Sequence, residues 1–233
     1  MAKDGAAGRA ARVSVWLVDR PRRSGRGGGQ PSGLDRERIT EVTVRLLDAE
    51  GLAGFSMRRL AAELNVTAMS VYWYVDTKDD LLELALDAVH GELRLPAPEA
   101  DTADWHEQLR ALAHEYRALL VRHPWLSPLV GTYLNIGPNS LAFSRAVQRV
   151  IRRTGLPAHG ISGAISAVFR FVYGYGTVEG HFLARGADFG MTPDDCFRHS
   201  VETVTGAPET LERDFVFALD LLIAGIEAMT ARG

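Results

Sequence analysis

Two short helical segments separated by a turn of about three residues constrain this chain more than any other feature of its sequence. Ser56 is a good N-cap for the segment 57–64, whose apolar residues recur on one helical face. Asn65 tolerates the left-handed conformation that ends a helix, and Thr67 can cap a second segment over 68–75. Two short helices joined in this way form a helix-turn-helix unit, whose second helix is suited to the DNA major groove.

Three consecutive aromatic residues, Tyr72, Trp73 and Tyr74, lie in the second segment. Neighbouring residues on a helix point in different directions, so the three side chains cannot all face the core. We expect Trp73 to pack beneath the helix and both tyrosines to face DNA.

Longer helical patterns flank this unit. Apolar residues recur at helical spacing from Ile39 to Leu47, and Gly51 supplies a C-terminal stop. Thr77, with Asp80 at the N3 position, forms a capping-box pattern that begins a longer helix. The broad apolar face of this later helix predicts that it connects the first three helices to the rest of the chain.

Beyond a proline-containing break near 94–101, helical patterns continue and no convincing strand run or fixed-period repeat occurs. We expect further helices at about 103–121, 125–134, 138–154, 158–184 and 208–231. The predicted fold is all-α, with an N-terminal three-helix helix-turn-helix domain and a larger C-terminal helical domain.

Charge and cysteine content narrow the class of protein. The net charge of −3 conceals a basic segment over 1–33, which holds seven Lys and Arg against two Asp. This segment is rich in Gly and Arg and cannot bury a core, so it is either a DNA-contacting arm or a solubilising tail. The single cysteine excludes an intramolecular disulfide and a multi-cysteine zinc site. No apolar run approaches the roughly 20 residues of a membrane span, so we expect a soluble, cytoplasmic protein without a membrane partner.

The stretch ITEVTVRLLDAEGLAGFSMRRLAAELNVTAMSVYWYVDTKDDLLELAL closely resembles the DNA-binding region of the TetR family of repressors. The stretches LLVRHPWLSPLVGTYLNIGP, VYGYGTVEGHF and FVFALDLLIAGIEAM resemble the ligand-binding domain of the tetracycline repressor subgroup. The resemblance implies a homodimer that binds a palindromic DNA operator and leaves it when a small molecule enters the C-terminal domain. An activator or an architectural DNA-binding protein with the same head is the alternative.

Four domain ranges follow from the patterns and the resemblance together. We expect a flexible basic arm over 1–33, a helix-turn-helix DNA-binding domain over 34–80, a connector helix over 81–94 and a ligand-binding and dimerisation domain over 95–233. No nucleophile elbow, phosphate loop, metal motif or plausible His–carboxylate pairing predicts an enzyme.

The resemblance also indicates which residues meet double-stranded DNA. It places residues 68–70 at the base-reading end, Tyr72 on phosphate and thymine-methyl surface, and Tyr74 and Lys78 on the DNA backbone. Arg58, near the start of its helix, is suited to phosphate or guanine, although a solvated arginine paired with an acid is the alternative. The predicted DNA-binding residues are Arg58, Thr67, Ala68, Met69, Ser70, Tyr72, Tyr74 and Lys78.

Candidate pocket residues of the C-terminal domain offer aromatic walls with few polar groups. They are Trp125, Tyr133, Asn135, Phe143, Phe169, Tyr173 and Glu179. The resembling repressors carry a metal-coordinating histidine where this chain has Leu129, which leaves Glu179 without a partner ligand. Glu179 is then free to bind an effector, or to pair with an arginine such as Arg170 or Arg185. We therefore expect an aromatic small-molecule effector, no metal site and no cofactor.

Two helical patterns are candidates for the dimer interface. The helix at 158–184 carries a stripe that permits close approach of a second helix, formed by Gly163, Ala167, Gly174 and Val178. The last helix carries a long apolar face, formed by Phe215, Leu219, Leu222, Ile226 and Met229. The pair resembles the four-helix dimer interface of the family, and the alternative is internal packing within one monomer.

Overall fold

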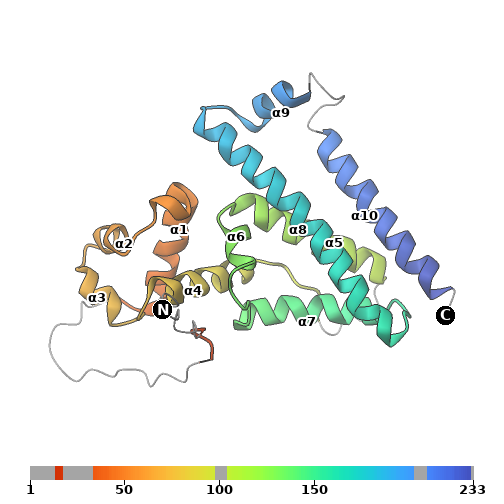
Figure 1. The fold of residues 1–233 in the computed structure, drawn as a ribbon, viewed down its shortest axis with the longest axis horizontal. Helices are drawn as coiled ribbons and strands as arrows, with labels where there is room; N and C mark the ends of the chain where they lie inside the picture. The colour runs from red at the N-terminus through yellow and green to blue at the C-terminus, as the bar shows by residue number, and fades with distance from the viewer. Residues whose placement is uncertain (1–13, 18–33, 98–103, 202–208, 232–233) are drawn as a thin grey trace, which may run out of the picture.

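The computed structural model describes residues 14–17, 34–97, 104–201 and 209–231, and the regular secondary structure of these residues is entirely α-helical. The all-α prediction is therefore confirmed. A small N-terminal head is joined to a longer helical body (Figure 1).

Three helices form the head: α1 (Arg36–Gly54), α2 (Met57–Glu63) and α3 (Ala68–Tyr72). The predicted caps are present, because the side chains of Ser56 and Thr67 accept hydrogen bonds from the backbone amides of Arg59 and Ser70. Gly51 interrupts α1 with a φ of 66° and a ψ of −179°, as expected for the stop. Local sequence signals thus determine where the helices of the head begin and turn.

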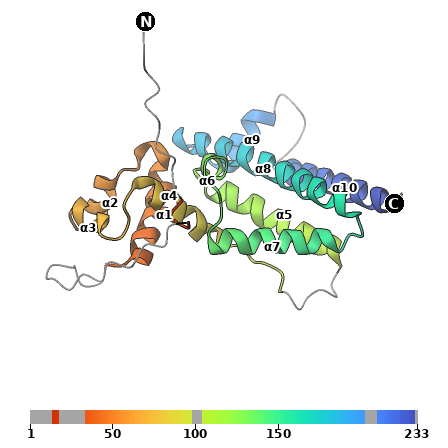
Figure 2. The same ribbon diagram turned by 60° about the horizontal axis from the view of Figure 1, so that its bottom comes forward.

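The connector is α4 (Lys78–His90), which packs against α1 in the head and against α6 and α7 in the body. Figure 2 shows α4 passing between the two parts. Its N-cap is Thr77, whose hydroxyl accepts a hydrogen bond of 2.9 Å from the amide of Asp80. The helix ends at His90, earlier than residue 94, with Gly91 as its C-cap, because the Gly91 amide turns back onto the carbonyls of Asp87 and Ala88.

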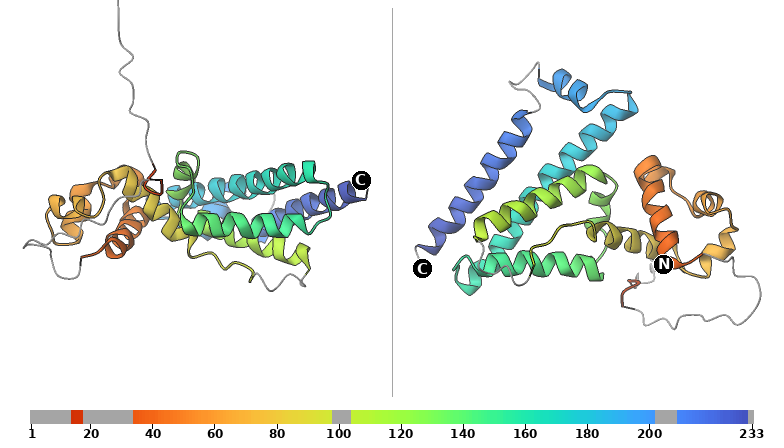
Figure 3. Two further views of the ribbon diagram at one scale, coloured as in Figure 1. Left: turned by 90° about the horizontal axis from the view of Figure 1, so that it is seen from below. Right: turned by 180° about the vertical axis from the view of Figure 1, so that it is seen from behind.

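The body is built from six helices in the described chain, namely α5 (Trp105–Arg122), α6 (Leu126–Val130), α7 (Pro138–Arg152), α8 (Ala158–Asp188), α9 (Pro193–Val201) and α10 (Glu209–Thr230). The most extensive packing is between α5 and α8. Figure 3 shows that α10 runs alongside α8 in the opposite direction, with α9 near the C-terminal end of α8.

Glycines make the close packing of α8 on α5 geometrically possible. A Cβ atom added to Gly176 would lie 2.9 Å from Cβ of Leu120, and one added to Gly180 would lie 2.8 Å from the Leu120 carbonyl oxygen. Both distances are shorter than side chains tolerate. These two glycines therefore offset their unfavourable helix propensity by allowing α8 to approach the backbone of α5.

The structure adds one helix that was not expected, shortens two others, and extends α8 to Asp188 rather than residue 184. Helix α9 was not expected, although Thr192 and Asp195 exchange the side chain-to-amide hydrogen bonds of a capping box at its start. Helix α3 ends at Tyr72 rather than residue 75. Helix α6 ends at Val130 rather than residue 134, because the Asn135 side chain donates 2.8 Å hydrogen bonds to the carbonyls of Val130 and Tyr133.

Part of the predicted flexible arm is packed against the head. Ser14 and Val15 are 4% and 7% exposed, and the Ser14 hydroxyl donates a hydrogen bond to the carboxylate of Glu83 on α4. A flexible arm was expected over 1–33, and residues 14–17 depart from that expectation because they are packed. The other residues of that arm lie outside the described part of the chain.

Among the helices of the described residues, none is both long enough and apolar enough to cross a membrane.

Candidate functional site

The helix-turn-helix unit is held together by a small apolar core beneath α3. Val71 and Val75 are 0% and 2% exposed and pack with Leu60 of α2. In the turn, Asn65 adopts a left-handed φ of 54°, as expected, and the Val66 amide donates to the Ala61 carbonyl at 2.9 Å. This packing fixes the orientation of α3 relative to α2.

The outer side of α3 exposes large apolar side chains. Met69, Trp73 and Tyr72 are 70%, 60% and 39% exposed. The prediction that Trp73 packs beneath the helix is wrong, because Val71 and Val75 occupy the core side of this short segment. Trp73 therefore joins Met69 and Tyr72 on the exposed surface. In the sequence, three consecutive aromatic residues do not indicate which of them is buried.

Polar residues border this surface. Thr67 caps α3 and its hydroxyl lies 2.9 Å from that of Ser70, while Ala68 is half-buried beside them. Arg58 is exposed and has no ion-pair partner among the described residues, whereas Arg59 pairs with acidic side chains at 2.8 and 3.0 Å. Arg58 is therefore the available guanidinium on this side of α2.

The two remaining candidates of the head have contacts within the protein. Tyr74 is half-buried and packs against the core. The Lys78 ammonium donates a 2.8 Å hydrogen bond to the Phe55 carbonyl and lies 5.2 Å from the centroid of the Phe55 ring. Lys78 therefore also holds the start of α4 against the connection between α1 and α2.

Five rings from four helices form a contiguous cluster inside the body, which we call the aromatic column. Its members are His90 of α4, Tyr116 of α5, Phe143 of α7, and Phe169 and Tyr173 of α8. The centroid of Tyr116 lies 4.9 Å from that of Phe143 and 5.4 Å from that of Phe169, and Phe169 lies 6.0 Å from Tyr173. Three of the seven predicted pocket residues thus meet in one place.

Tyr116 and His90 were missed as site residues. The Tyr116 hydroxyl is buried and has no hydrogen-bond partner among the described residues. Burial lowers the pKa of His90, and this outweighs the hydrogen bond between its Nδ1 and the Leu86 carbonyl oxygen at 2.8 Å. A neutral imidazole that donates through Nδ1 leaves Nε2 as an acceptor. The column thus offers apolar ring faces together with the unpartnered hydroxyl of Tyr116.

Glu179 is paired within the body, but not with the expected arginines. Arg117 of α5 contacts both of its carboxylate oxygens, at 2.7 and 3.1 Å, and also pairs with Glu212 of α10. The expectation of Arg170 or Arg185 is therefore wrong. Arg117 is only 7% exposed and its guanidinium carbon lies 4.5 Å from the centroid of Phe215. The long-range packing of α5 on α8 brings this pair together, and the local sequence around Glu179 does not reveal it.

Trp125, Tyr133 and Asn135 lie outside the aromatic column. The Trp125 indole donates a 2.6 Å hydrogen bond to Asp48 of α1, at the junction with the head. The Tyr133 hydroxyl donates to Asp79 of α4 at 2.9 Å, and Asn135 closes the loop after α6. Trp125 and Tyr133 therefore fix the body to the head and the connector, whereas Asn135 acts within the body.

The connector is also bound to the start of α7. Asp87 of α4 is 3% exposed and accepts hydrogen bonds from the backbone amides of Asn139 and Ser140, at 3.3 and 2.8 Å. Its charge therefore lies at the N-terminus of α7, where the helix dipole favours an anion. Three residues further along α4, His90 enters the aromatic column.

The apolar side of α10 that was assigned to the dimer interface packs within the chain. Phe215, Leu219 and Ile226 are 0%, 1% and 8% exposed, so that assignment is wrong for these residues. The exposed large apolar side chains of α10 are Phe217, Leu221 and Met229. An open cavity of about 510 Å³ on α10 shares no lining residue with the aromatic column and is lined by Glu212, Arg213, Val216, Phe217 and Asp220.

The stripe on α8 faces away from the body, as expected for an intermolecular contact. Gly163, Ala167 and Val178 are exposed, and a Cβ atom added to Gly163 or Gly174 would meet no atom within 4 Å. In contrast, Val172 and Gly176 on the other side of the helix are buried.

The described residues contain no group of three or more His, Cys, Asp or Glu side chains arranged to hold a metal ion.

A helix-turn-helix head with an exposed recognition helix, joined by a buried connector to a helical body, defines a DNA-binding transcriptional regulator. The family described as "Bacterial regulatory proteins, tetR family" matches residues 39–85, and "Tetracyclin repressor-like, C-terminal domain" matches residues 95–230. The chain belongs to the TetR family of transcriptional repressors, with a ligand-binding C-terminal domain.

Individual relatives agree with this assignment. The HTH-type transcriptional repressor DrrR1 of Streptomyces coeruleorubidus is 39% identical over 238 residues, covering 95% of this chain and 87% of that protein. An HTH-type transcriptional regulator of Saccharopolyspora erythraea is 40% identical over 146 residues, covering 63% of this chain but only 61% of that protein. The crystal structure of the TetR family protein ActR from Streptomyces coelicolor in complex with actinorhodin has a TM-score of 0.67 and 25% identity, covering 85% of this chain and 97% of that chain.

Proposed function

We propose that this protein is a homodimeric repressor that binds a palindromic operator through α2 and α3 and leaves it when an aromatic small molecule enters the C-terminal body. The observation that carries the DNA-binding part is the exposure of Met69, Tyr72 and Trp73 on α3. Large apolar side chains in water are unfavourable, and contact with thymine methyl groups and sugars would cover them.

The proposed division of roles follows the geometry of the head. Residues 67–70 lie at the N-terminal end of α3, which enters the major groove in this motif. Arg58, Tyr72, Tyr74 and Lys78 border that end and contact phosphates. Trp73 is added to this set because of its exposure.

The proposed effector is aromatic because the interior of the body offers stacked rings. A planar molecule that enters the body and separates these rings would stack on their faces, and the unpartnered Tyr116 hydroxyl would bind a polar group on it. ActR, which is similar to this chain, has been crystallised with actinorhodin. This likeness supports a small-molecule effector.

We further propose that the effector binds without a metal ion. Leu129 is an apolar side chain with 5% exposure, and both carboxylate oxygens of Glu179 contact the Arg117 guanidinium. A carboxylate that is already paired and lacks an imidazole neighbour is a poor ligand for Mg²⁺.

The proposed dimer joins α8 and α10 of two copies. The exposed stripe on α8 lacks side chains that would keep a second helix away, and Phe217 and Leu221 on α10 provide apolar area. A two-fold dimer presents two recognition helices and therefore binds a palindromic site.

The DNA-binding part is tested by footprinting DNA around the gene of this protein and measuring affinity for the protected site. Trp73→Ala should weaken binding to that site, whereas Phe189→Ala, which removes another exposed ring (76%) from the body, should leave it unchanged. Equal effects of both substitutions would contradict the assignment of Trp73 to the DNA interface. The absence of a protected palindrome would contradict the whole proposal.

The effector is tested by titrating polycyclic aromatic compounds into the protein–operator complex in excess EDTA. Release in EDTA is expected for at least one compound, because the proposed site uses no metal. A compound that releases the operator only after Mg²⁺ is restored would contradict the metal-independent site. Transcription from the protected promoter in vitro distinguishes repression from activation.

A further inference from the structure

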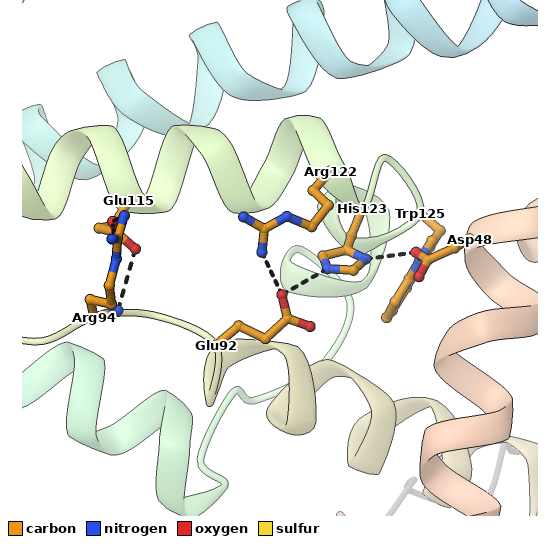
Figure 4. Close-up of polar contacts among 7 residues, drawn as sticks. All are labelled: Asp48, Glu92, Arg94, Glu115, Arg122, His123 and Trp125. Atoms are coloured by element: carbon orange, nitrogen blue, oxygen red, sulfur yellow. Dashed lines mark hydrogen bonds and ion pairs between the residues drawn. The ribbon is translucent and has the colours of Figure 1, made fainter.

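A polar cluster around the buried side chain of His123 joins the head to the body at a point that the proposed DNA and effector sites do not use. His123, in the turn between α5 and α6, lies with Nδ1 2.6 Å from Asp48 of α1 and with Nε2 3.2 Å from Glu92, which follows α4 (Figure 4). The indole nitrogen of Trp125 donates to the same Asp48 oxygen at 2.6 Å. We call Asp48, Glu92, His123 and Trp125 the interdomain latch.

The geometry of the latch requires a charged imidazole. Both ring nitrogens of His123 face carboxylates, and a neutral ring carries only one N–H, so only the imidazolium can donate to both. The ring is 4% exposed, and burial alone would oppose its charge. Hydrogen bonds and charges from Asp48 and Glu92 outweigh that burial and raise the pKa of His123 above its ordinary value.

Several helices bring charged or titratable side chains close to His123. Asp48 comes from α1, Glu92 follows α4, and Arg122 of α5 contacts Glu92 at 2.5 Å. From α8, Nε2 of His181 lies 3.2 Å from the Pro124 carbonyl oxygen. Loss of the His123 proton would leave two carboxylates beside a buried neutral ring and would remove one of its two hydrogen bonds.

The latch also adjoins the aromatic column. The Leu126 amide donates to the His123 carbonyl at 2.8 Å, and the carbonyl of Ser127 accepts a 2.8 Å hydrogen bond from the hydroxyl of Tyr173, which ends the column. Residues 123–127 therefore contact the head through Asp48 and the column through Tyr173. A displacement of Tyr173 would act directly on the segment that carries His123 and Trp125.

We propose that Asp48, His123 and Trp125 are positioning residues that hold the DNA-binding head at a fixed orientation on the body while His123 is protonated. This inference deepens the proposed function, because it gives the aromatic column a route to the head through α1 in addition to α4. The latch is closed below the ordinary pKa of the imidazole and opens as the pH rises through the raised pKa of His123.

The test measures the position of the head in the full-length protein without DNA or effector. Spin labels replace Met69 on α3 and Ser144 on α7, both exposed, in a background in which Cys196 is changed to Ala. The doubly labelled chain is diluted with unlabelled protein, so that the measured distance is the one between two labels on the same chain. At about pH 6 the distance distribution should be narrow, and at about pH 9 it should broaden.

Matched variants assign the effect to the latch. Asp48→Asn keeps an acceptor for Trp125 but removes the charge that faces His123, so the distribution should be broad at both pH values. Asp48→Glu should restore part of the pH response. Glu115→Gln is the control, because it breaks the neighbouring Arg94–Glu115 pair, which does not reach α1 (Figure 4). Circular dichroism verifies that each variant is folded, and Glu92→Gln replaces Asp48→Asn if that variant does not fold.

Histidine NMR provides an independent readout. The His123 resonance, assigned by its absence in His123→Gln, should titrate with a midpoint above the ordinary value of 6.5, and the midpoint should fall in Asp48→Asn. The proposal is overturned if wild-type and Asp48→Asn distance distributions match at both pH values, or if Glu115→Gln broadens the distribution equally. Because neither measurement uses DNA or an effector, failure of the repressor assignment would leave this result unaffected, and the reverse also holds.

Discussion

Lys78 has a structural role in the free protein in addition to its proposed contact with DNA. Its ammonium group donates to the carbonyl of Phe55 and lies over the ring of the same residue. The charge is therefore held at the start of α4, close to the recognition helix in the sequence, rather than on an unrestrained side chain. Such pre-positioning lowers the entropy cost of meeting a phosphate.

We predict that Lys78→Ala weakens binding to all DNA sequences alike and lowers the salt slope by about one unit per half-site, as expected for a phosphate contact. Fluorescence anisotropy of operator and unrelated DNA at several salt concentrations measures both quantities. Lys78→Arg retains the charge and should retain the slope. A loss restricted to one operator base pair would identify Lys78 as a base-reading residue instead.

The hydroxyl of Tyr116 is buried inside the aromatic column. Because the hydroxyl has no partner among the described residues, Tyr116→Phe should leave the free energy of unfolding unchanged or raise it by about 1 kcal/mol, while weakening effector-induced release. Tyr173→Phe is the matched control. It loses a hydrogen bond to Ser127 and should lower the free energy of unfolding by about 1 kcal/mol. Urea denaturation in which Tyr116→Phe is the less stable variant would contradict this assignment.

At the scale of a single element, α8 uses its glycines for two purposes. Gly176 and Gly180 allow contact with α5 inside the chain, whereas Gly163 and Gly174 face open space. The same residue type therefore packs the body on one side of the helix and leaves room for a partner on the other.

We predict that Gly180→Ala lowers the free energy of unfolding by about 1–3 kcal/mol, since the new methyl group would lie 2.8 Å from the Leu120 carbonyl oxygen and 3.2 Å from Cα of Val121. Gly160→Ala on the same helix is the control. Its methyl group would make an ordinary 3.8 Å contact with Leu156, and alanine favours the helix by about 1 kcal/mol. Similar unfolding curves for the two variants would show that α8 does not need Gly180 for its packing.

For the molecule as a whole, the proposed surface for self-association consists of the exposed stripe of α8 and the exposed apolar residues of α10. We predict that Gly174→Glu disrupts the homodimer, because a carboxylate without a partner is strongly unfavourable in a close helix crossing. Sedimentation velocity should show a shift from dimer to monomer. Ser144→Glu places the same charge at an exposed position of α7 and should leave the dimer intact. An unchanged dimer for Gly174→Glu would place the interface elsewhere.

The local structure of the head could be predicted from short stretches of the sequence. Ser56, Thr67 and Thr77 cap helices, and Asn65 and Gly51 adopt positive φ angles, as their positions predicted. These signals depend on atoms within a few residues of each other, so one short stretch contains the information. The all-α class and most helix positions follow from apolar periodicity for the same reason.

Which side chains meet depends on how distant helices pack, and the sequence did not reveal it. The exposure of Trp73 depends on which neighbouring valines fill the core beneath α3, and the inward packing of Phe215 depends on how α10 lies against the body. Arg117 and Glu179 are 62 residues apart, and Asp48 and Trp125 are 77 apart, yet each pair shares a short hydrogen bond. Such contacts result from the packing of whole helices, because helical periodicity identifies an apolar face but does not specify the surface that covers it.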